Sequence, residues 1–326
     1  MKYLLPTALL VSLIGVKCQQ RHDNYPLIKV IYPETFKDTT QQDTYFGSTV
    51  ADPYRWLEDD QSKETAKWVD AQNQVSFGYL KQIPFRDSIR TQLTRIWNYP
   101  KYSTPFSEGG WYFFFKNNGL QNQSVLYIQK GLQDEPRILI DPNTLSKDGT
   151  TSLSAFSVSK DGKYAAYSLS EGGSDWNTIH VISLPESKEM SDVISWVKFS
   201  EISWYKDGFF YSKYPSPTEG NELKSSNQFQ KVYYHQIGTP TANDLLIFQD
   251  LSNPLHGHYA NVTEDEQYLV LSISKGTYGN KILVNDLSKG LQSPFIKVVD
   301  DFENESSVID ANGTSWYIFT NIEAPK

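Results

Sequence analysis

The sequence contains one cysteine, two methionines and five histidines among its 326 residues. A single cysteine cannot form a disulfide within the chain. Runs of basic residues are also missing, because 30 Lys and Arg residues face 38 Asp and Glu residues without clustering. This balance argues against nucleic acid as a partner. After residue 18, no segment is apolar over the length that a membrane span requires.

Aromatic residues supply much of the apolar content that is present. Hydrophobic residues make up 39% of the chain and aromatic residues 14%, which is enough for one big domain or two ordinary ones. A fully buried aromatic side chain removes roughly 150–250 Å² from water. Because aromatic residues favour strands, a core rich in aromatics and poor in methionine predicts sheets rather than helices.

The first eighteen residues differ in character from the rest. A short positive start precedes an apolar run over residues 4–16, and polar sequence begins at Gln19. This pattern is typical of a bacterial export signal, so we expect a signal peptide over residues 1–18 and an exported, periplasmic protein. Two alternatives stay open at Cys18: it is the lipidated first residue of a lipoprotein, or cleavage nearby starts the mature chain. Only lipidation would tie the mature protein to a membrane, and Lys17 argues against it.

A helical pattern covers residues 52–98. Apolar residues recur there at spacings of three and four, as in an amphipathic helix that packs one face inward: Trp68, Ala71, Val75 and Tyr79. Asp52 and Pro53 predict a helix start, with Asp52 as the N-cap and Pro53 in the first turn. Asp52, Glu58 and Asp59 could be active-site carboxylates, but a capping and solvated acidic turn is the favoured interpretation.

A second pattern begins after Tyr99 and continues to the end of the chain. A short apolar strand, a polar turn and an aromatic-led strand recur, with the leading aromatic residues roughly fifty positions apart. This spacing is about the length of one four-stranded blade of a β-propeller. The five copies are residues 105–113 (PFSEGGWYF), 156–164 (FSVSKDGKY), 202–210 (ISWYKDGFF), 262–268 (VTEDEQY) and 308–317 (VIDANGTSWY).

The last copy is the only one without a further strand of similar character behind it. Four blades and the opening of a fifth are therefore expected, with the chain stopping inside a repeat at Lys326. Half a repeat unit would leave strand edges and a sheet face uncovered. We interpret the chain as the N-terminal portion of a longer protein.

No local motif for a catalytic nucleophile is present. The nearest approach to a Gly-x-Ser-x-Gly elbow is residues 172–176 (GGSDW), which lack the closing glycine, so Ser174 is interpreted as a turn residue. His180 and His235 fall on expected strands. His256 and His258 could bind a metal weakly, but no third ligand is evident, so we expect neither metal nor cofactor. The chain alone has no recognisable catalytic site.

Several segments, in order, resemble the prolyl oligopeptidase family. The most specific is the family's opening motif, which residues 50–59 (VADPYRWLED) resemble. The other similar segments are residues 43–47 (DTYFG), 83–86 (IPFR), 99–103 (YPKYS), 119–127 (GLQNQSVLY) and 172–176 (GGSDW). A generic propeller would share only the rhythm of the blades.

This resemblance implies a serine endopeptidase that cuts short peptides on the C-terminal side of proline. It implies an α/β-hydrolase peptidase domain covered by a seven-bladed β-propeller that restricts access to the active site. Residues 19–98 would be the N-terminal helical segment of the peptidase domain, and residues 99–326 an incomplete propeller of about four and a half blades. The catalytic Ser, Asp and His would lie in a C-terminal α/β-hydrolase segment beyond Lys326.

One substrate contact can be carried over from the family to residues 197–200 (VKFS), where the family's phenylalanine lines the apolar part of the substrate cleft. Phe199 is therefore the only candidate site residue, and an ordinary blade aromatic is the alternative. Residues 274–277 (SKGT) depart from the arginine and cysteine that some members carry there, so no role is assigned to them. A non-catalytic propeller that binds proline-containing peptides is the competing hypothesis for the whole chain.

Overall fold

The computed structural model describes residues 29–326 except for 219, 221, 223–224, 314 and 325–326. The expected signal peptide, residues 1–18, and Cys18 lie outside the described residues. The chain divides into two compact units, one ending at Leu93 and the other beginning at Thr94. In the described residues no helix has the length and apolar character needed to cross a membrane. The predicted domain boundary at residues 98 and 99 stays a prediction.

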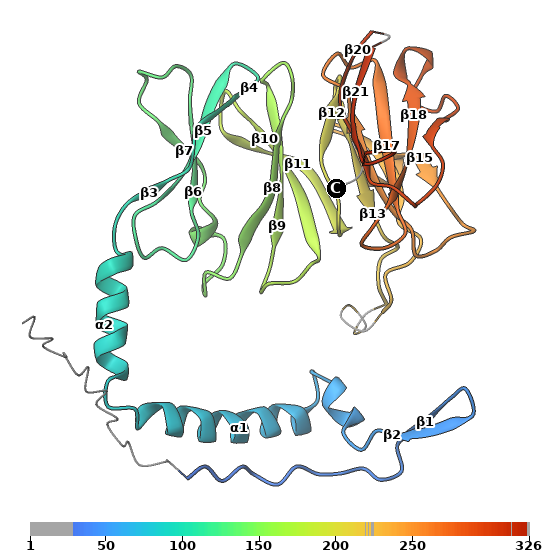
Figure 1. Ribbon diagram of the computed structural model, residues 1–326. Helices are drawn as coiled ribbons and strands as arrows, with labels where there is room; N and C mark the ends of the chain where they lie inside the picture. Colours follow the sequence, from blue (N-terminus) through green and yellow to red (C-terminus); the bar gives the residue numbers. More distant parts are fainter. Residues whose placement is uncertain (1–28, 219, 221, 223–224, 314, 325–326) are drawn as a thin grey trace, which may run out of the picture. The chain divides into compact units, whose positions relative to one another are not determined.

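The first unit contains a hairpin and a long helix (Figure 1). Strands β1 (Gln42–Tyr45) and β2 (Ser48–Ala51) pair antiparallel, and the 3-10 helix η1 (Arg55–Glu58) precedes α1 (Lys63–Lys81). Helix α2 (Arg86–Trp97) leads to the second unit. Three residues of the predicted inward face of α1, Trp68, Ala71 and Val75, are half-buried, whereas Tyr79 is exposed.

The predicted helix start at Asp52 is wrong. The N-cap of α1 is Ser62, whose hydroxyl oxygen accepts a hydrogen bond from the Thr65 amide at 3.0 Å. Asp52 instead accepts a hydrogen bond from Nε of Arg55 at 3.0 Å. Only a single 3-10 turn follows Pro53, and the Asp52 carboxylate forms an ion pair with Arg55 and caps no helix.

In its described residues the second unit contains antiparallel sheets of five, eight and four strands and a final hairpin. The five-stranded sheet is here called blade 1 and the four-stranded sheet blade 4. The eight-stranded sheet comprises blades 2 and 3, which are joined only where Val197 of β11 pairs with Lys213 of β13. Blade 1 is β4–β7 with β3 added to β5, blade 2 is β8–β11, blade 3 is β12–β15, blade 4 is β16–β19, and the hairpin is β20–β21. The strands of blades 1 and 2 are β3 (Lys101–Tyr102), β4 (Phe106–Glu108), β5 (Trp111–Asn117), β6 (Val125–Gln129), β7 (Arg137–Ile140), β8 (Ser152–Val158), β9 (Tyr164–Ser170), β10 (Asn177–Ser183) and β11 (Lys188–Val197). The remaining strands are β12 (Ser203–Tyr205), β13 (Gly208–Lys213), β14 (Lys231–Gln236), β15 (Leu245–Gln249), β16 (Gly257–Val262), β17 (Tyr268–Ser274), β18 (Asn280–Asp286), β19 (Ile296–Val299), β20 (Ser306–Asn312) and β21 (Ser315–Thr320). Short 3-10 helices lie at η2 (Pro142–Thr144), η3 (Thr241–Asn243) and η4 (Leu287–Lys289).

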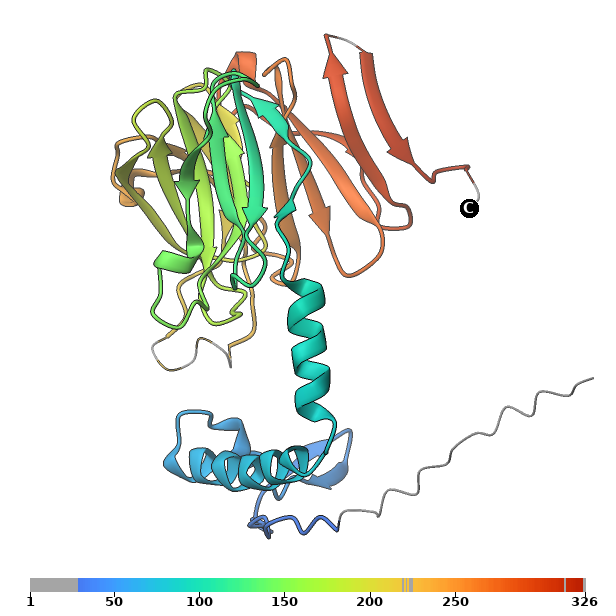
Figure 2. The same cartoon turned by 90° about the vertical axis from the view of Figure 1, so that its left-hand side faces the viewer.

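The structure confirms a mainly β, partial propeller of about four and a half blades. Each of the five repeat copies forms the first hairpin of a blade, with its polar turn between the first two strands. Figures 1 and 2 show the blades in chain order, with the β20–β21 hairpin at the red end. The aromatic-led turns were sufficient to locate the blades because each turn connects neighbouring strands of one sheet.

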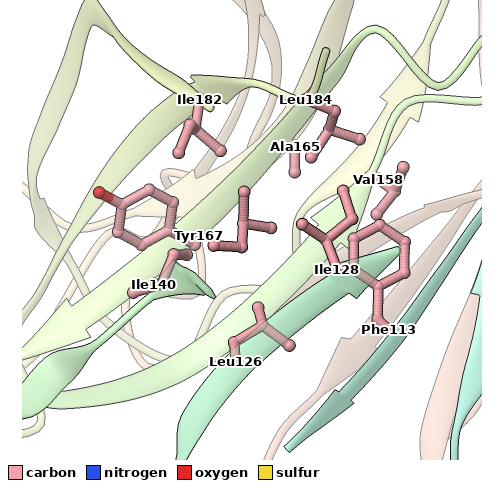
Figure 3. Packing of buried hydrophobic residues seen from close by; sticks show 10 residues of the cluster. Phe113, Leu126, Ile128, Ile140, Val158, Ala165, Tyr167, Ile182 and Leu184 are labelled. Carbon is pink, nitrogen blue, oxygen red and sulfur yellow. The ribbon is translucent and has the colours of Figure 1, made fainter. Parts of the chain in front are cut away.

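Consecutive blades pack face to face through buried apolar clusters. The cluster between blades 1 and 2 is shown in Figure 3 and includes Phe113, Leu126, Ile128, Val158 and Tyr167. Since neighbouring residues of a strand point to opposite faces, Tyr167 of β9 joins this cluster while Ala166 joins the cluster between blades 2 and 3. Burying a side chain such as Phe113 completely stabilises the fold by about 1.5–3 kcal/mol.

The final hairpin packs against blade 4 in the same way. Trp316 of β21 lies with its ring centroid 4.8 Å from that of Tyr268. Val308 and Trp316 contact the buried residues Val270 and Ile282 of blade 4. The hairpin therefore occupies the position of the first two strands of a fifth blade.

Two glycines bring the ends of blades 1 and 2 into backbone contact. Gly162 has a φ of +68°, and a Cβ atom there would lie 1.9 Å from the carbonyl oxygen of Gly109. We expect Gly162→Ala to lower the free energy of unfolding by about 2–3 kcal/mol, through left-handed strain plus overlap with that oxygen. Urea denaturation measures this loss.

Gly172→Ala is the matched control for this prediction. Gly172 has a φ of +59°, but nothing lies within 4 Å of the position a Cβ would take. Gly172→Ala should therefore lower the free energy of unfolding only by the left-handed strain of the alanine, which is about 1–2 kcal/mol. Equal losses in the two variants would contradict the proposed backbone contact.

Candidate functional site

Phe199 lies in the connection between β11 and β12, in a conformation that few side chains adopt. Its φ is +53°, in the left-handed region, and its side chain is 48% exposed. The preceding Val197 is 2% exposed and packs between blades 2 and 3. The connection therefore turns from the core outward within two residues and exposes the ring.

Hydrogen bonds to blade 3 hold both the backbone and a side chain of this connection. Nε2 of Gln230 donates to the carbonyl oxygens of Lys198 at 3.2 Å and Phe199 at 3.0 Å. The hydroxyl oxygen of Ser200 accepts from the backbone amide of Ser212 at 2.8 Å. Both interactions tie the connection to blade 3.

An aromatic cluster surrounds Lys198, whose side chain is only 13% exposed. Its Nζ atom lies 5.0 Å from the ring centroid of Trp176 and 5.4 Å from that of Phe199. At such distances an ammonium group is attracted to the face of an aromatic ring by about 0.5–1 kcal/mol or more. The Trp176 ring also meets Trp196 edge-on at 5.6 Å and Tyr214 at 6.4 Å. Lys198 thus helps to fix the rings rather than extending into solvent.

Three hollows open around this cluster. Phe199 lines one of about 320 Å³, together with serine hydroxyls of blade 2 at Ser152, Ser154, Ser168 and Ser170. Trp176 lines two others, of about 580 and 220 Å³. Apolar ring faces beside hydroxyl donors and acceptors can bind a short peptide, because they offer both apolar contact and backbone hydrogen bonding.

Ser174 lies in the turn between β9 and β10, where its hydroxyl oxygen accepts from the Trp176 amide at 3.1 Å. It lines the same hollow as Phe199. Glu58 and Asp59 are exposed. His256 lies edge-on to the Phe302 ring at 5.1 Å, whereas His258 is buried and bonded to Gln230. The part of the chain that the structure describes contains no group of three residues that could hold a metal ion.

A buried ionisable cluster between blades 2 and 3 was missed from sequence. Nδ1 of His235 lies 2.7 Å from Asp244 and Nε2 lies 2.9 Å from Asp192. The three side chains are 0%, 2% and 1% exposed. The hydroxyl of Tyr211 donates to the other Asp244 oxygen at 2.7 Å. Because solvent does not reach it, we interpret the cluster as part of the packing between blades 2 and 3 and not as a substrate site.

Burial alone disfavours a charged imidazole, but the hydrogen bonds with Asp244 and Asp192 outweigh it and raise the pKa of His235. The pKa of His258 is lowered instead, first because the ring is buried, with its bond to Gln230 opposing. Burial likewise lowers the pKa of His180. The ordinary value for all three is 6.5.

We therefore expect NMR titration of the histidine rings to place His235 above 6.5 and both His180 and His258 below it. The stabilisation from His235 is complete below pH 6.5 and is lost as pH rises through its raised folded-state pKa. The contribution of His258 to folding stability depends on pH in the opposite sense: it is present above pH 6.5 and is lost as pH falls through its lowered folded-state pKa. A His235 midpoint at or below its ordinary value would contradict this arrangement.

Comparison with known families and proteins gives a consistent result. The family model described as prolyl oligopeptidase, N-terminal β-propeller domain, matches residues 33–326. The prolyl endopeptidase of Elizabethkingia meningoseptica is 44% identical over 295 residues, which is 90% of this chain and 41% of that protein. Prolyl oligopeptidase A of Amanita bisporigera is 36% identical over 321 residues, covering 89% of this chain and 42% of that protein. The chain thus spans about two fifths of the length of these relatives.

Solved structures show the same likeness. Prolyl oligopeptidase B from Galerina marginata, bound to a 35mer hydrolysis and macrocyclization substrate, superimposes with a TM-score of 0.80 at 32% identity. The alignment covers 90% of this chain and 44% of that one. This chain therefore shares its fold, over 90% of its own length, with a protein of known structure.

Proposed function

The chain belongs to the prolyl oligopeptidase family, and on this premise we propose that it is the propeller-containing portion of a serine endopeptidase. The proposed enzyme cuts short peptides on the C-terminal side of proline, and its propeller restricts access to the active site. The catalytic Ser, Asp and His belong to an α/β-hydrolase segment outside this chain. The exposed ring of Phe199, fixed beside a hollow of about 320 Å³, is the observation that carries the proposal.

Phe199 would provide the apolar part of the peptide site. A proline ring has no polar atom to satisfy, so it can pack against an aromatic face without leaving a hydrogen-bonding group buried and unpaired. The hydroxyls of Ser154 and Ser170 already donate to the carbonyl oxygens of Ser168 and Ser174, so these two could accept a hydrogen bond from a peptide amide but not donate one. This chain would thus bind and orient the peptide and exclude water, while another segment supplies the chemistry.

In the complete enzyme the reaction would be acyl transfer. A histidine takes the proton of the serine hydroxyl as that oxygen attacks the carbonyl carbon of the proline residue, and an oxyanion hole stabilises the tetrahedral intermediate. The C–N bond then breaks, the histidine gives its proton to the leaving amine, and water hydrolyses the acyl-enzyme in the same way.

Exposed apolar side chains in the first unit support a covering segment. Helix α1 exposes Val69, Phe77 and Leu80, and the part of α2 in this unit exposes Ile89 and Leu93. Large apolar side chains that are exposed in such numbers on neighbouring helices are typical of a surface that another segment covers. Packing of the α/β-hydrolase segment on these helices would bury it.

We also propose that the chain is exported. Residues 1–18 would direct the chain to the periplasm, with the mature protein soluble or anchored by lipid through Cys18. Mass spectrometry of the processed N-terminus separates these outcomes. A mature chain that begins near Gln19 without lipid supports the soluble form, diacylglycerol on Cys18 supports the anchored form, and retention of Met1 would contradict export.

Peptide binding tests the role of Phe199. We expect the chain to bind short proline-containing peptides in isothermal titration calorimetry, and Phe199→Ala to weaken that binding about tenfold, equivalent to ~1.4 kcal/mol. Phe319→Ala is the matched control, because Phe319 is an exposed phenylalanine of β21 in the final hairpin and should leave the affinity unchanged. Equal affinity in the wild type and Phe199→Ala would remove Phe199 from the site.

A further inference from the structure

Gln230 is a fully buried glutamine, 0% exposed, immediately before β14. Its side-chain nitrogen donates to two successive carbonyl oxygens, those of Lys198 and Phe199. Its side-chain oxygen accepts from the backbone amide of His258 at 2.5 Å. The nitrogen and the oxygen of the side-chain amide therefore both have partners.

The neighbouring bonds fix which way this amide points. The partner of Oε1 is a backbone N–H, which can only donate, and the partners of Nε2 are carbonyl oxygens, which can only accept. A reversed amide would set oxygen against two oxygens and nitrogen against a donor. The amide thus has one arrangement that satisfies every partner.

His258 connects the same network to blade 4. Its Nδ1 atom donates to the backbone carbonyl oxygen of Gln230 at 2.8 Å. The backbone carbonyl oxygen of His258 accepts from the Ser212 hydroxyl at 2.7 Å. The Ser212 backbone amide in turn holds Ser200 at 2.8 Å. The connection that carries Phe199 is therefore attached to blades 3 and 4 by side chains that are themselves buried.

The backbone of Phe199 requires such support. A non-glycine residue in the left-handed region is disfavoured relative to ordinary backbone, so an unsupported connection would relax to other conformations. Relaxation would move the ring away from the hollow it lines. The two bonds from Gln230 act on the carbonyls on either side of the Phe199 N–Cα bond and oppose that change.

We propose that Gln230 is a positioning residue: its buried amide holds Phe199 in the left-handed conformation that presents the ring to the peptide. This inference rests on the proposed function for its effect on peptide affinity. The effect on the connection itself is independent of peptide. Gln230 touches no substrate and acts only through Phe199.

Three measurements on the 326-residue chain test this role. In Gln230→Met, which keeps the side-chain length but has no amide, hydrogen exchange of residues 196–201 should accelerate at least about tenfold without peptide. Affinity for a proline-containing peptide should fall about tenfold, as in Phe199→Ala. Adding Gln230→Met to Phe199→Ala should cause no further loss of affinity, because the two residues act as one unit.

Asn285→Leu is the matched control. Asn285 is also 0% exposed, and its amide nitrogen donates to the carbonyl oxygens of Leu291 and Ser293 in a loop of blade 4. Asn285→Leu should lower the midpoint of thermal unfolding as Gln230→Met does. It should leave hydrogen exchange at residues 196–201 and peptide affinity unchanged. Gln230→Glu keeps the shape and the acceptor for His258 but leaves at most one donor, from a protonated carboxyl, so it is the second variant if Gln230→Met does not fold.

The outcomes separate this inference from the proposed function. Unchanged exchange at residues 196–201 in both Gln230 variants would overturn the positioning role. So would a loss of affinity that adds fully to that of Phe199→Ala. If the wild-type chain binds no proline-containing peptide, the proposed function fails, while the exchange experiment still decides whether Gln230 holds the connection.

Discussion

Replacing His235 with leucine is expected to lower the free energy of unfolding by about 3–5 kcal/mol. Asp192 and Asp244 flank this ring, and both carboxylates are almost completely buried. With the imidazole removed, two carboxylates would face each other in a region that water does not reach. Asp192 would keep the hydrogen bond from the Gly238 amide, and Asp244 would keep the one from the Tyr211 hydroxyl. One donor for each carboxylate is too little to stabilise two buried charges.

Urea denaturation of His235→Leu measures this loss, with His180→Leu as control. His180 lies on β10, stacks on Tyr167 at 5.4 Å and is only half-buried, so its replacement should change stability by less than about 1 kcal/mol. Adding Asp192→Asn and Asp244→Asn to His235→Leu should recover part of the loss, since the charges are then absent. A loss no greater than that of His180→Leu would show that the buried cluster contributes little.

Phe113→Ala is expected to cost about 3–5 kcal/mol at the interface between blades 1 and 2. The Phe113 side chain is 0% exposed, and its ring centroid lies 5.2 Å from those of both Phe106 and Phe156. Replacement leaves a cavity between two sheets that cannot close without moving the backbone. Phe106→Ala, at a position already 38% exposed, should cost about 1 kcal/mol.

The location of this loss can be measured as well as its size. Stacked repeats contact mainly their neighbours, so weakening one interface should release the blade at the end of the stack first. In Phe113→Ala, hydrogen exchange should therefore accelerate in β5 and β6 of blade 1 and stay slow in β17 and β18 of blade 4. Uniform acceleration across all blades would indicate a single cooperative unit instead.

The sequence was sufficient to predict the blades because the signals that define them are local. Each aromatic-led turn, such as residues 156–164, connects two strands that pair with each other, so no distant partner had to be known. The same local reasoning failed at Asp52, where the carboxylate could cap a helix or pair with a cation. Arg55, three residues away, forms that pair.

The supports of the candidate site could not be predicted in this way. Gln230 and Phe199 are 31 positions apart, and His235 and Asp192 are 43 apart. The Gln230 side chain reaches the Phe199 backbone, and the His235 ring reaches Asp192, only because blades 2 and 3 pack against each other. A polar residue on the inward face of a strand, as at Asp192, is the one sequence signal that could have indicated a buried partner.

The claim that this chain is the propeller-containing portion of a prolyl endopeptidase is tested most directly with a chimeric enzyme. In this chimera, residues 33–326 of this chain replace the matching portion of the Elizabethkingia meningoseptica prolyl endopeptidase. The chimera is expected to cleave a proline-linked chromogenic peptide, a serine-directed inhibitor should abolish that cleavage, and this chain alone should show no turnover. A folded but inactive chimera would contradict the claim, as would inhibitor-sensitive cleavage by the 326-residue chain without a partner.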